Sequence, residues 1–192
     1  MGTVSSFRTR AAEGLDRRGF SIAEIEAMIA AGVLDDDEKF ELIEGEIVPM
    51  GPQALPHVLM KGAIGRALVT ACPPEIWVVQ DATLLLDGKS FFEPDVLVFR
   101  PNREHRYVEP EDVLLAVEVA DTSRVRDLVT KPPRYGTAGV TEMWVVELNE
   151  QRTYVFRRPG TADWTQPVQV PFSSDLAPLF LPDVRIRLSD LA

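Results

Sequence analysis

The sequence LLAVEVADTS, residues 114–123, sets one glutamate inside an almost unbroken run of apolar residues. A short apolar run that is rich in β-branched residues and bounded by polar ones is typical of a strand covered on both faces. The run therefore predicts a buried strand, with Glu118 in or near the core. An isolated buried carboxylate is costly, so such a group is normally paired, protonated or bound to a metal ion. We therefore expect Glu118 to have a partner.

Helical and strand patterns alternate on both sides of this run. SIAEIEAMIAAG at 21–32 predicts a helix with a capping box, and PHVLMKGAIGRALVTAC at 56–72 predicts a longer helix. FELIEGEIVPM at 40–50 alternates around Glu44-Gly45, which predicts a tight hairpin. A helical segment is predicted from about residue 123, and strands are predicted at 76–80, 82–86, 95–100, 142–148, 152–158, 164–170 and 184–188. This order predicts an α/β or α+β fold, with helices flanking a mixed central sheet and added β-hairpins.

Length and composition describe an ordinary globular chain. Its 192 residues suffice for one core, so we expect a single domain at 20–192 after a disordered tail at 1–19. An apolar fraction of 45% and a charged fraction of 26% exclude collagen-like, coiled-coil and wholly disordered classes. Cys72 is the only cysteine, and no apolar run approaches the roughly 20 residues of a membrane helix. We therefore expect a cytoplasmic protein with no membrane partner.

The net charge restricts the ways in which the chain could bind nucleic acid. The formal charge is −10 at pH 7, which is the wrong sign for a protein that coats nucleic acid through bulk electrostatics. Any nucleic-acid partner therefore needs a local basic groove.

Asp95 and Glu118 are candidates for a metal site, because each lies in or beside a predicted apolar strand. In FFEPDVLVF, residues 91–99, Asp95 follows a proline at the mouth of a hydrophobic strand, and Glu118 lies within the next strongly apolar strand. If these strands are neighbours, the carboxylates converge and raise each other's pKa unless a cation intervenes. Oxygen ligands of this kind suit Mg²⁺ or Mn²⁺. Lys131 shares a helical face with Asp127 and could meet this acidic pocket.

Structural interpretations of the same residues stay open. Glu118 could form a buried ion pair with Lys131 or Arg124 that only stabilises the fold. His57 is expected on the surface at a helix start and His105 in a loop, without a ligand cluster around them. The apolar strands around Trp77 and Trp144 predict that both side chains pack in the core.

An ordered set of motifs gives the chain a family resemblance. FELIEGE, EPDVLVF, LLAVEVADTS, Asp127 with Lys131, and AGVTEMWVVEL together resemble the Uma-two family, within the PD-(D/E)xK nuclease superfamily, over residues 20–158. LPDVRIRLSDL, residues 181–191, resembles the family's usual ending. The resemblance implies a restriction-endonuclease-like core and a homodimer or higher oligomer. It also implies that Asp95 is the motif aspartate and Glu118 the second acid.

The resemblance extends to the remaining site residues. Lys131 replaces the usual strand lysine, because the position two after Glu118 is Ala120. Glu41 matches an early family glutamate. The hypothesis is a metal-dependent endonuclease acting on DNA, with Mg²⁺ or Mn²⁺ held by Asp95, Glu118 and the carbonyl of Val119. Lys131 would orient the attacking water or neutralise charge. Glu41 would bind the ion through a water molecule, or contact a metal ligand without binding the ion itself. The rival hypothesis is a catalytically silent protein that keeps the nuclease fold for nucleic-acid binding or assembly.

Pro132 and Pro133 follow Lys131 directly, where the family usually has uninterrupted helix. A residue before proline is pushed away from helical angles, so we expect a break or kink beside Lys131. If a helix resumes at Pro132, Lys131 becomes a junction residue with an extended backbone. Its long side chain is still expected to reach the acidic pocket.

Overall fold

The computed structural model describes residues 18–35, 37–121, 126–158, 164 and 166–191. The chain divides into two compact units, which are described separately. The first unit comprises Met1–Pro52 with Asp87–Phe92, and the second comprises Gln53–Leu86 with Glu93–Ala192. The predicted tail at 1–19 lies almost wholly outside the described residues, and the single domain at 20–192 stays a prediction.

The first unit combines a helix with short antiparallel strands. Its elements are α1 (Ile22–Ala30), β1 (Phe40–Ile43), β2 (Glu46–Pro49) and β5 (Ser90–Phe92). The predicted capping box is present, because Ser21 and Glu24 bond each other's backbone amides. The predicted hairpin joins β1 to β2 through Glu44 and Gly45, which have φ angles of 52° and 84°. A Cβ atom at Gly45 would lie 2.7 Å from the Cα of Gly19, so this position requires glycine.

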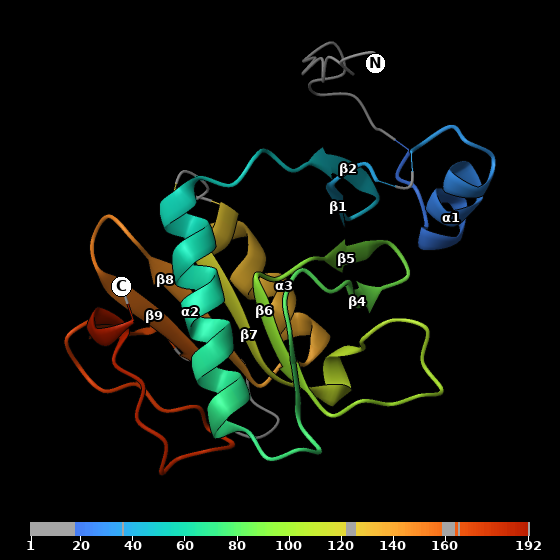
Figure 1. Cartoon of the computed structure of the whole chain (residues 1–192). Coiled ribbons are helices and arrows are strands. Elements are labelled where there is room, and N and C mark those ends of the chain that lie inside the picture. The colour runs from blue at the N-terminus through green and yellow to red at the C-terminus, as the bar shows by residue number, and fades with distance from the viewer. Residues whose placement is uncertain (1–17, 36, 122–125, 159–163, 165, 192) are drawn as a thin grey trace. The chain divides into compact units, whose positions relative to one another are not determined.

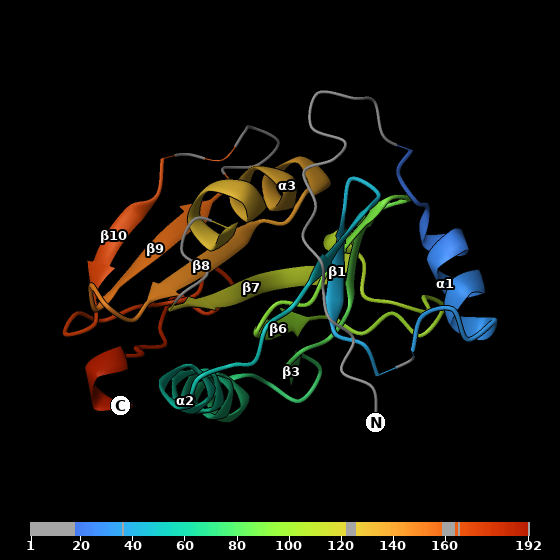
Figure 2. The ribbon, with the colours of Figure 1, turned by 90° about the horizontal axis from the view of Figure 1, so that it is seen from above.

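The second unit is a mixed sheet covered by a helix on each face (Figures 1 and 2). Its sheet has the order β10-β9-β8-β7-β6-β3, in which only β7 and β8 run parallel. The strands are β3 (Trp77–Val79), β6 (Val96–Phe99), β7 (Val113–Ala120), β8 (Glu142–Glu147), β9 (Arg152–Arg157) and β10 (Val168–Pro171); β4 (Leu84–Asp87) ends at the unit boundary. The helices are α2 (Leu55–Ala71), α3 (Lys131–Ala138), a π-helix η2 (Arg126–Thr130) and the 3₁₀ helices η1 (Pro110–Asp112) and η3 (Leu188–Asp190). Figure 2 shows α2 and α3 on opposite faces of this sheet.

Strand β7 is the buried strand that the sequence predicts. Val117 and Val119 belong to the core cluster that packs with Ile64 and Leu68 of α2. Because side chains alternate along a strand, Glu118 points to the other face, on which α3 lies. The apolar run therefore places one carboxylate under α3.

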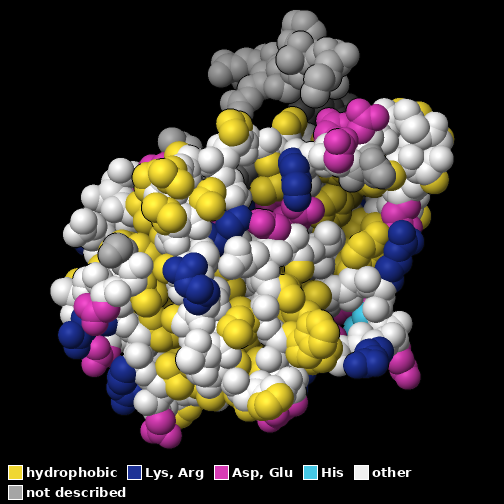
Figure 3. Space-filling model, in the orientation of Figure 1, with side chains coloured by type: hydrophobic (Ala, Val, Ile, Leu, Met, Phe, Trp, Pro, Cys, Tyr) yellow, Lys and Arg dark blue, Asp and Glu magenta, His cyan; other side chains and the backbone are white. Residues whose placement is uncertain are grey.

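The outer face of α2 is apolar as well as its inner face. Apolar side chains reach the surface over this helix (Figure 3), where the exposed large ones are Leu55, Val58, Leu59 and Val69. The helix also carries two charged side chains, of which Arg66 is exposed and Lys61 is buried. None of the helices in the described residues is both long and apolar enough to cross a membrane.

Three expectations differ from the structure at the edges of the sheet. Residues 184–188 form no strand, since Ile186 makes only an isolated bridge to Leu176. The strand predicted at 164–170 is observed at Val168–Pro171. Trp144 is fully buried as predicted, but Trp77 is 51% exposed because β3 is the edge strand. The core position predicted for Trp77 is therefore wrong.

The chain around Lys131 also differs from the expectation. A π-helix runs to Thr130, and α3 begins at Lys131, so the predicted extended backbone at Lys131 is wrong. Pro132 and Pro133 occupy the first turn of α3, where a missing amide leaves no helical hydrogen bond unmade. The chain therefore changes from a π-helix to an α-helix beside Lys131, where a break or kink was predicted. The predicted start of the helix near residue 123 lies outside the described residues.

Candidate functional site

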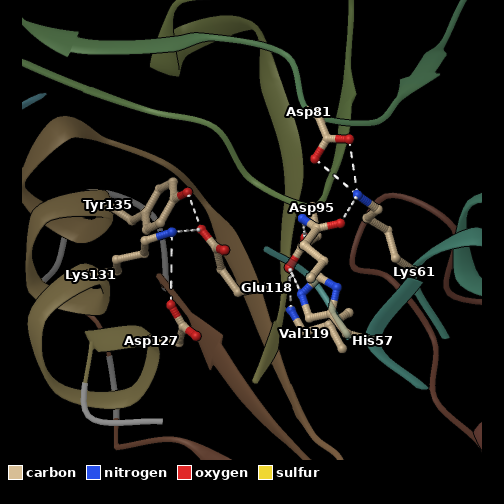
Figure 4. Close-up of polar contacts among 10 residues, drawn as sticks. His57, Lys61, Asp81, Asp95, Glu118, Val119, Asp127, Lys131 and Tyr135 are labelled. Carbon is tan, nitrogen blue, oxygen red and sulfur yellow. Dashed lines mark hydrogen bonds and ion pairs between the residues drawn. The ribbon is translucent and has the colours of Figure 1, made fainter. Parts of the chain in front are cut away.

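Glu118 is the centre of a buried polar cluster on the α3 side of the sheet (Figure 4). Its Oε1 accepts a hydrogen bond from Lys131 Nζ at 2.9 Å and another from the Tyr135 hydroxyl at 2.7 Å. Lys131 Nζ also lies 3.8 Å from Asp127 Oδ1. All four residues are at most 3% exposed. The expected partner of the buried Glu118 carboxylate is therefore present, and it consists of a buried lysine and a tyrosine hydroxyl.

The spacing of the cluster explains how one helical segment supplies three of its members. Asp127, Lys131 and Tyr135 follow each other at four-residue intervals across η2 and α3. Residues four apart lie on the same face of a helix, so the three side chains form one stripe. The prolines in the first turn of α3 do not disturb this stripe, because the helix continues through them.

Asp95 lies beside the same strand but contacts different residues. It directly precedes β6, whose Val96 is paired with Val117 of β7. Asp95 Oδ2 accepts the backbone amide of Val119 at 2.7 Å and lies 3.2 Å from His57 Nε2. Asp95 Oδ1 accepts a longer hydrogen bond of 3.4 Å from Gln53 Nε2. Asp95 is thereby fixed next to the peptide that follows Glu118.

A second buried lysine lies behind this aspartate. Lys61 is 5% exposed and donates to Gln53 Oε1 at 2.7 Å. It also donates to both carboxylate oxygens of Asp81, at 3.0 and 2.9 Å. A continuous chain of polar contacts therefore runs from Asp95 through Gln53 to Lys61 and Asp81, as Figure 4 shows in part.

The structure brings some of the predicted site residues together. Lys131 contacts Glu118, as predicted, and the strands β6 and β7 are neighbours, so Asp95 lies against the chain at Val119. The two carboxylates turn to different partners, Glu118 toward Lys131 and Asp95 toward His57 (Figure 4). Glu41 is a buried residue of β1 in the first unit. The catalytic roles of these residues stay predictions.

His57 is the site residue that the sequence interpretation misplaced. It was expected on the surface, but its side chain is only 12% exposed and faces Asp95. A signal was present in the sequence, because Gln53, His57 and Lys61 recur at four-residue intervals before and along an otherwise apolar helix. These three positions lie on one helical face, from which Gln53 and His57 contact Asp95 and Lys61 contacts Gln53 and Asp81.

His105 belongs to an acidic group in the loop before η1. One ligand atom each from His105, Glu109 and Glu111 lie within 4.8 Å of one another, and His57 is not part of this group. His105 also contacts Asn102 at 3.3 Å and Asp112 at 3.2 Å. Exposed acidic groups of this kind are common without an ion. The group is therefore explained by local loop contacts.

The donor atoms around Asp95 suit a divalent cation. Among the residues that the structure describes, Oδ1 of Asp95 accepts only the long hydrogen bond from Gln53, so it keeps a lone pair for a ligand bond. The amide of Val119 points toward Asp95, and the carbonyl of a strand residue points to the same side as its amide. Carboxylate and carbonyl oxygens are the ligands that Mg²⁺ and Mn²⁺ prefer. The residues therefore fit the predicted ion.

Comparison with known proteins agrees with this fold. No curated protein matches the sequence. The structure is similar to a crystal structure of "a putative nuclease belonging to DUF820" from Anabaena variabilis ATCC 29413, with a TM-score of 0.70 and 15% identity over 90% of this chain and 97% of that chain. At that identity the likeness shows the fold alone, and it confirms the predicted nuclease-like core. The sequence matches the Uma2 family, described as "Putative restriction endonuclease", over residues 22–189. The chain therefore belongs to the Uma2 family.

Proposed function

We propose that this protein is a divalent-metal-dependent endonuclease that hydrolyses phosphodiester bonds in DNA. The proposal depends on one observation: the side chains of Asp95 and Glu118 lie on either side of the peptide bond between Glu118 and Val119 in the central strand β7. Glu118 lies on β7, and Asp95 accepts the amide of the next residue, Val119, at 2.7 Å. Membership of a family described as restriction endonucleases supports the reaction class.

Three oxygen ligands would hold the metal ion. They are the carboxylates of Asp95 and Glu118 and the carbonyl of Val119, and the ion would be Mg²⁺ or Mn²⁺. A bound divalent cation supplies a more acidic water molecule and stabilises the charge that develops on the phosphate. The protein contributes by fixing the ligands before the ion arrives, because both carboxylates are already hydrogen-bonded to groups on rigid elements.

Lys131 would act on the face of the sheet that α3 covers (Figure 2), away from the core that packs against α2. Its ammonium group contacts Oε1 of Glu118, and Tyr135 donates to the same oxygen. The two donors fix the orientation of the carboxylate, and the lysine reduces the negative charge around an incoming phosphate. We propose that Lys131 orients the attacking water or neutralises charge.

One observation favours the alternative of a catalytically silent protein. Lys131 and Tyr135 both contact the buried carboxylate of Glu118, which therefore already has a cation beside it. Such a network stabilises a unique fold without any need for a metal ion. A protein of this kind would keep the nuclease fold for nucleic-acid binding or assembly.

Metal-dependent stabilisation and DNA cleavage separate the two functions. We would measure thermal unfolding with Mg²⁺, Mn²⁺ or EDTA, and cleavage of plasmid and single-stranded DNA. Asp95→Asn removes one proposed ligand, and Asp183→Asn is the matched control at an exposed position. An ion at 100 times its dissociation constant stabilises by about 2.7 kcal/mol, which is expected for the wild type and the control only. Neither stabilisation nor cleavage by the wild type would favour the silent protein.

A further inference from the structure

The contact between His57 and Asp95 joins the first turn of α2 to the start of β6. His57 Nε2 lies 3.2 Å from Asp95 Oδ2, and the two side chains are 12% and 8% exposed. Both residues belong to the second unit. His57 therefore contacts Asp95, a proposed metal ligand, but the proposed function gives His57 no role.

The hydrogen bonds around Asp95 distinguish its two oxygens. Oδ2 accepts the amide of Val119 at 2.7 Å and lies 3.2 Å from His57 Nε2, so nitrogen atoms from two different elements contact one oxygen. Oδ1 receives only the 3.4 Å bond from Gln53 among the described residues. Two donors on one oxygen fix the plane of a carboxylate, which leaves the other oxygen for a ligand bond.

The surroundings of the imidazole ring select one tautomer. His57 Nδ1 is buried and has no hydrogen-bond partner among the described residues. A proton on Nδ1 would bury an unpaired N–H donor, which costs about 1–3 kcal/mol. A proton on Nε2 would instead face the Asp95 carboxylate, whose Oδ2 lies 3.2 Å from that nitrogen. The geometry therefore favours the tautomer that carries its proton on Nε2.

We propose that His57 is a positioning residue, which donates its Nε2 proton to Asp95 Oδ2 and holds Oδ1 toward the metal ion. The inference rests on the proposed function, because it requires Asp95 to be a ligand. Gln53 has the opposite effect, since its amide occupies Oδ1. Gln53 is an exposed residue whose other amide atom is held by Lys61, so its bond to Asp95 is the one that an ion would displace.

Metal affinity tests this assignment without any cleavage assay. Isothermal titration with Mn²⁺ would compare the wild type with four variants, His57→Ala, His57→Gln, His57→Asn and Gln53→Ala. The amide nitrogen of glutamine overlays Nε2 of the imidazole, whereas that of asparagine overlays Nδ1. Loss of a residue that orients a ligand weakens metal binding by about 10–100-fold, which we expect for His57→Ala and His57→Asn. His57→Gln should retain most of the affinity, and Gln53→Ala should bind at least as tightly as the wild type.

The outcomes separate the positioning role from the proposed function. Wild-type affinity in His57→Ala, with normal thermal unfolding in EDTA, would overturn the positioning role alone. Equal weakening in the glutamine and asparagine variants would also overturn it, because the role depends on a donor at Nε2. No Mn²⁺ binding by the wild type would overturn the proposed function and this role with it.

The tautomer offers a second readout that needs no metal. His57 and His105 are the only histidines, so His105→Gln leaves one imidazole to observe by ¹⁵N NMR. In the metal-free protein we expect the ring proton of His57 on Nε2. A proton on Nδ1 would contradict the hydrogen bond and overturn the inference, even if the protein binds Mn²⁺.

Discussion

Replacing Glu118 by glutamine removes the negative charge that Lys131 faces in the interior. Lys131 Nζ lies 2.9 Å from Glu118 Oε1 and 3.8 Å from Asp127 Oδ1, and its side chain is 2% exposed. The sequence alone suggests that the substitution is harmless without metal, because a carboxylate crowded by Asp95 is costly. The contact with Lys131 reverses this expectation, since the change leaves a buried cation with weaker partners.

The size of the effect follows from the contacts that remain. Removing one partner of a buried ion pair costs about 3–5 kcal/mol. Asp127 still faces the ammonium group, and the glutamine carbonyl can accept one of the two bonds that Lys131 and Tyr135 donate to Oε1. We therefore expect Glu118→Gln to lower the free energy of unfolding by about 2–3 kcal/mol in EDTA.

Urea unfolding in EDTA measures this difference. The midpoint of Glu118→Gln should fall while the slope of the transition stays unchanged. Glu75→Gln is the control, because Glu75 is exposed in a turn. In the double variant, Lys131→Met removes the ammonium group that has lost its partner, but it also takes the lysine away from buried Asp127, so only part of the loss should be recovered. A single variant as stable as the wild type would refute the reasoning.

Three further predictions concern catalysis, helix capping and the thiol. Lys131→Ala should lower Mg²⁺-dependent DNA cleavage at least about tenfold, about 1.4 kcal/mol of transition-state stabilisation; equal rates per folded molecule would exclude a catalytic role. Ser21→Ala should destabilise α1 by about 1 kcal/mol, measured by hydrogen exchange of its amides. The Ser21 amide and the Arg18 side chain hold the pKa of Glu24 below its usual value, so this cap should weaken only as acid protonates Glu24. Burial raises the pKa of the Cys72 thiol, so alkylation at neutral pH should be slower than for a free cysteine and should speed up on unfolding.

Features set by local sequence were predictable. The apolar run around Glu118 is enough to predict a strand buried on both faces, and the burial of its carboxylate requires a partner. The spacing of Asp127 and Lys131 predicted the helical face that supplies this partner. The capping box and the Glu44-Gly45 hairpin are likewise local patterns, and both are present.

Features that depend on distant segments were not predictable. The position of His57 depends on where the start of β6 meets α2, which no local pattern encodes. Trp77 has an apolar strand pattern, but its exposure follows from the place of β3 at the edge of the sheet. The rule against helical angles before proline failed at Lys131, because the π-helix before it leads directly into the first turn of α3.

Titration of Mn²⁺ into the metal-free protein tests the central proposal most directly. The proposal predicts binding by the wild type and by Asp183→Asn, and at least about tenfold weaker binding by Asp95→Asn, which removes a ligand charge next to Val119. Asp95→Asn should also fail to cleave DNA under conditions in which the wild type does. Equal Mn²⁺ affinity in the wild type and Asp95→Asn, or no binding by either, would contradict a metal site at Asp95 and Glu118.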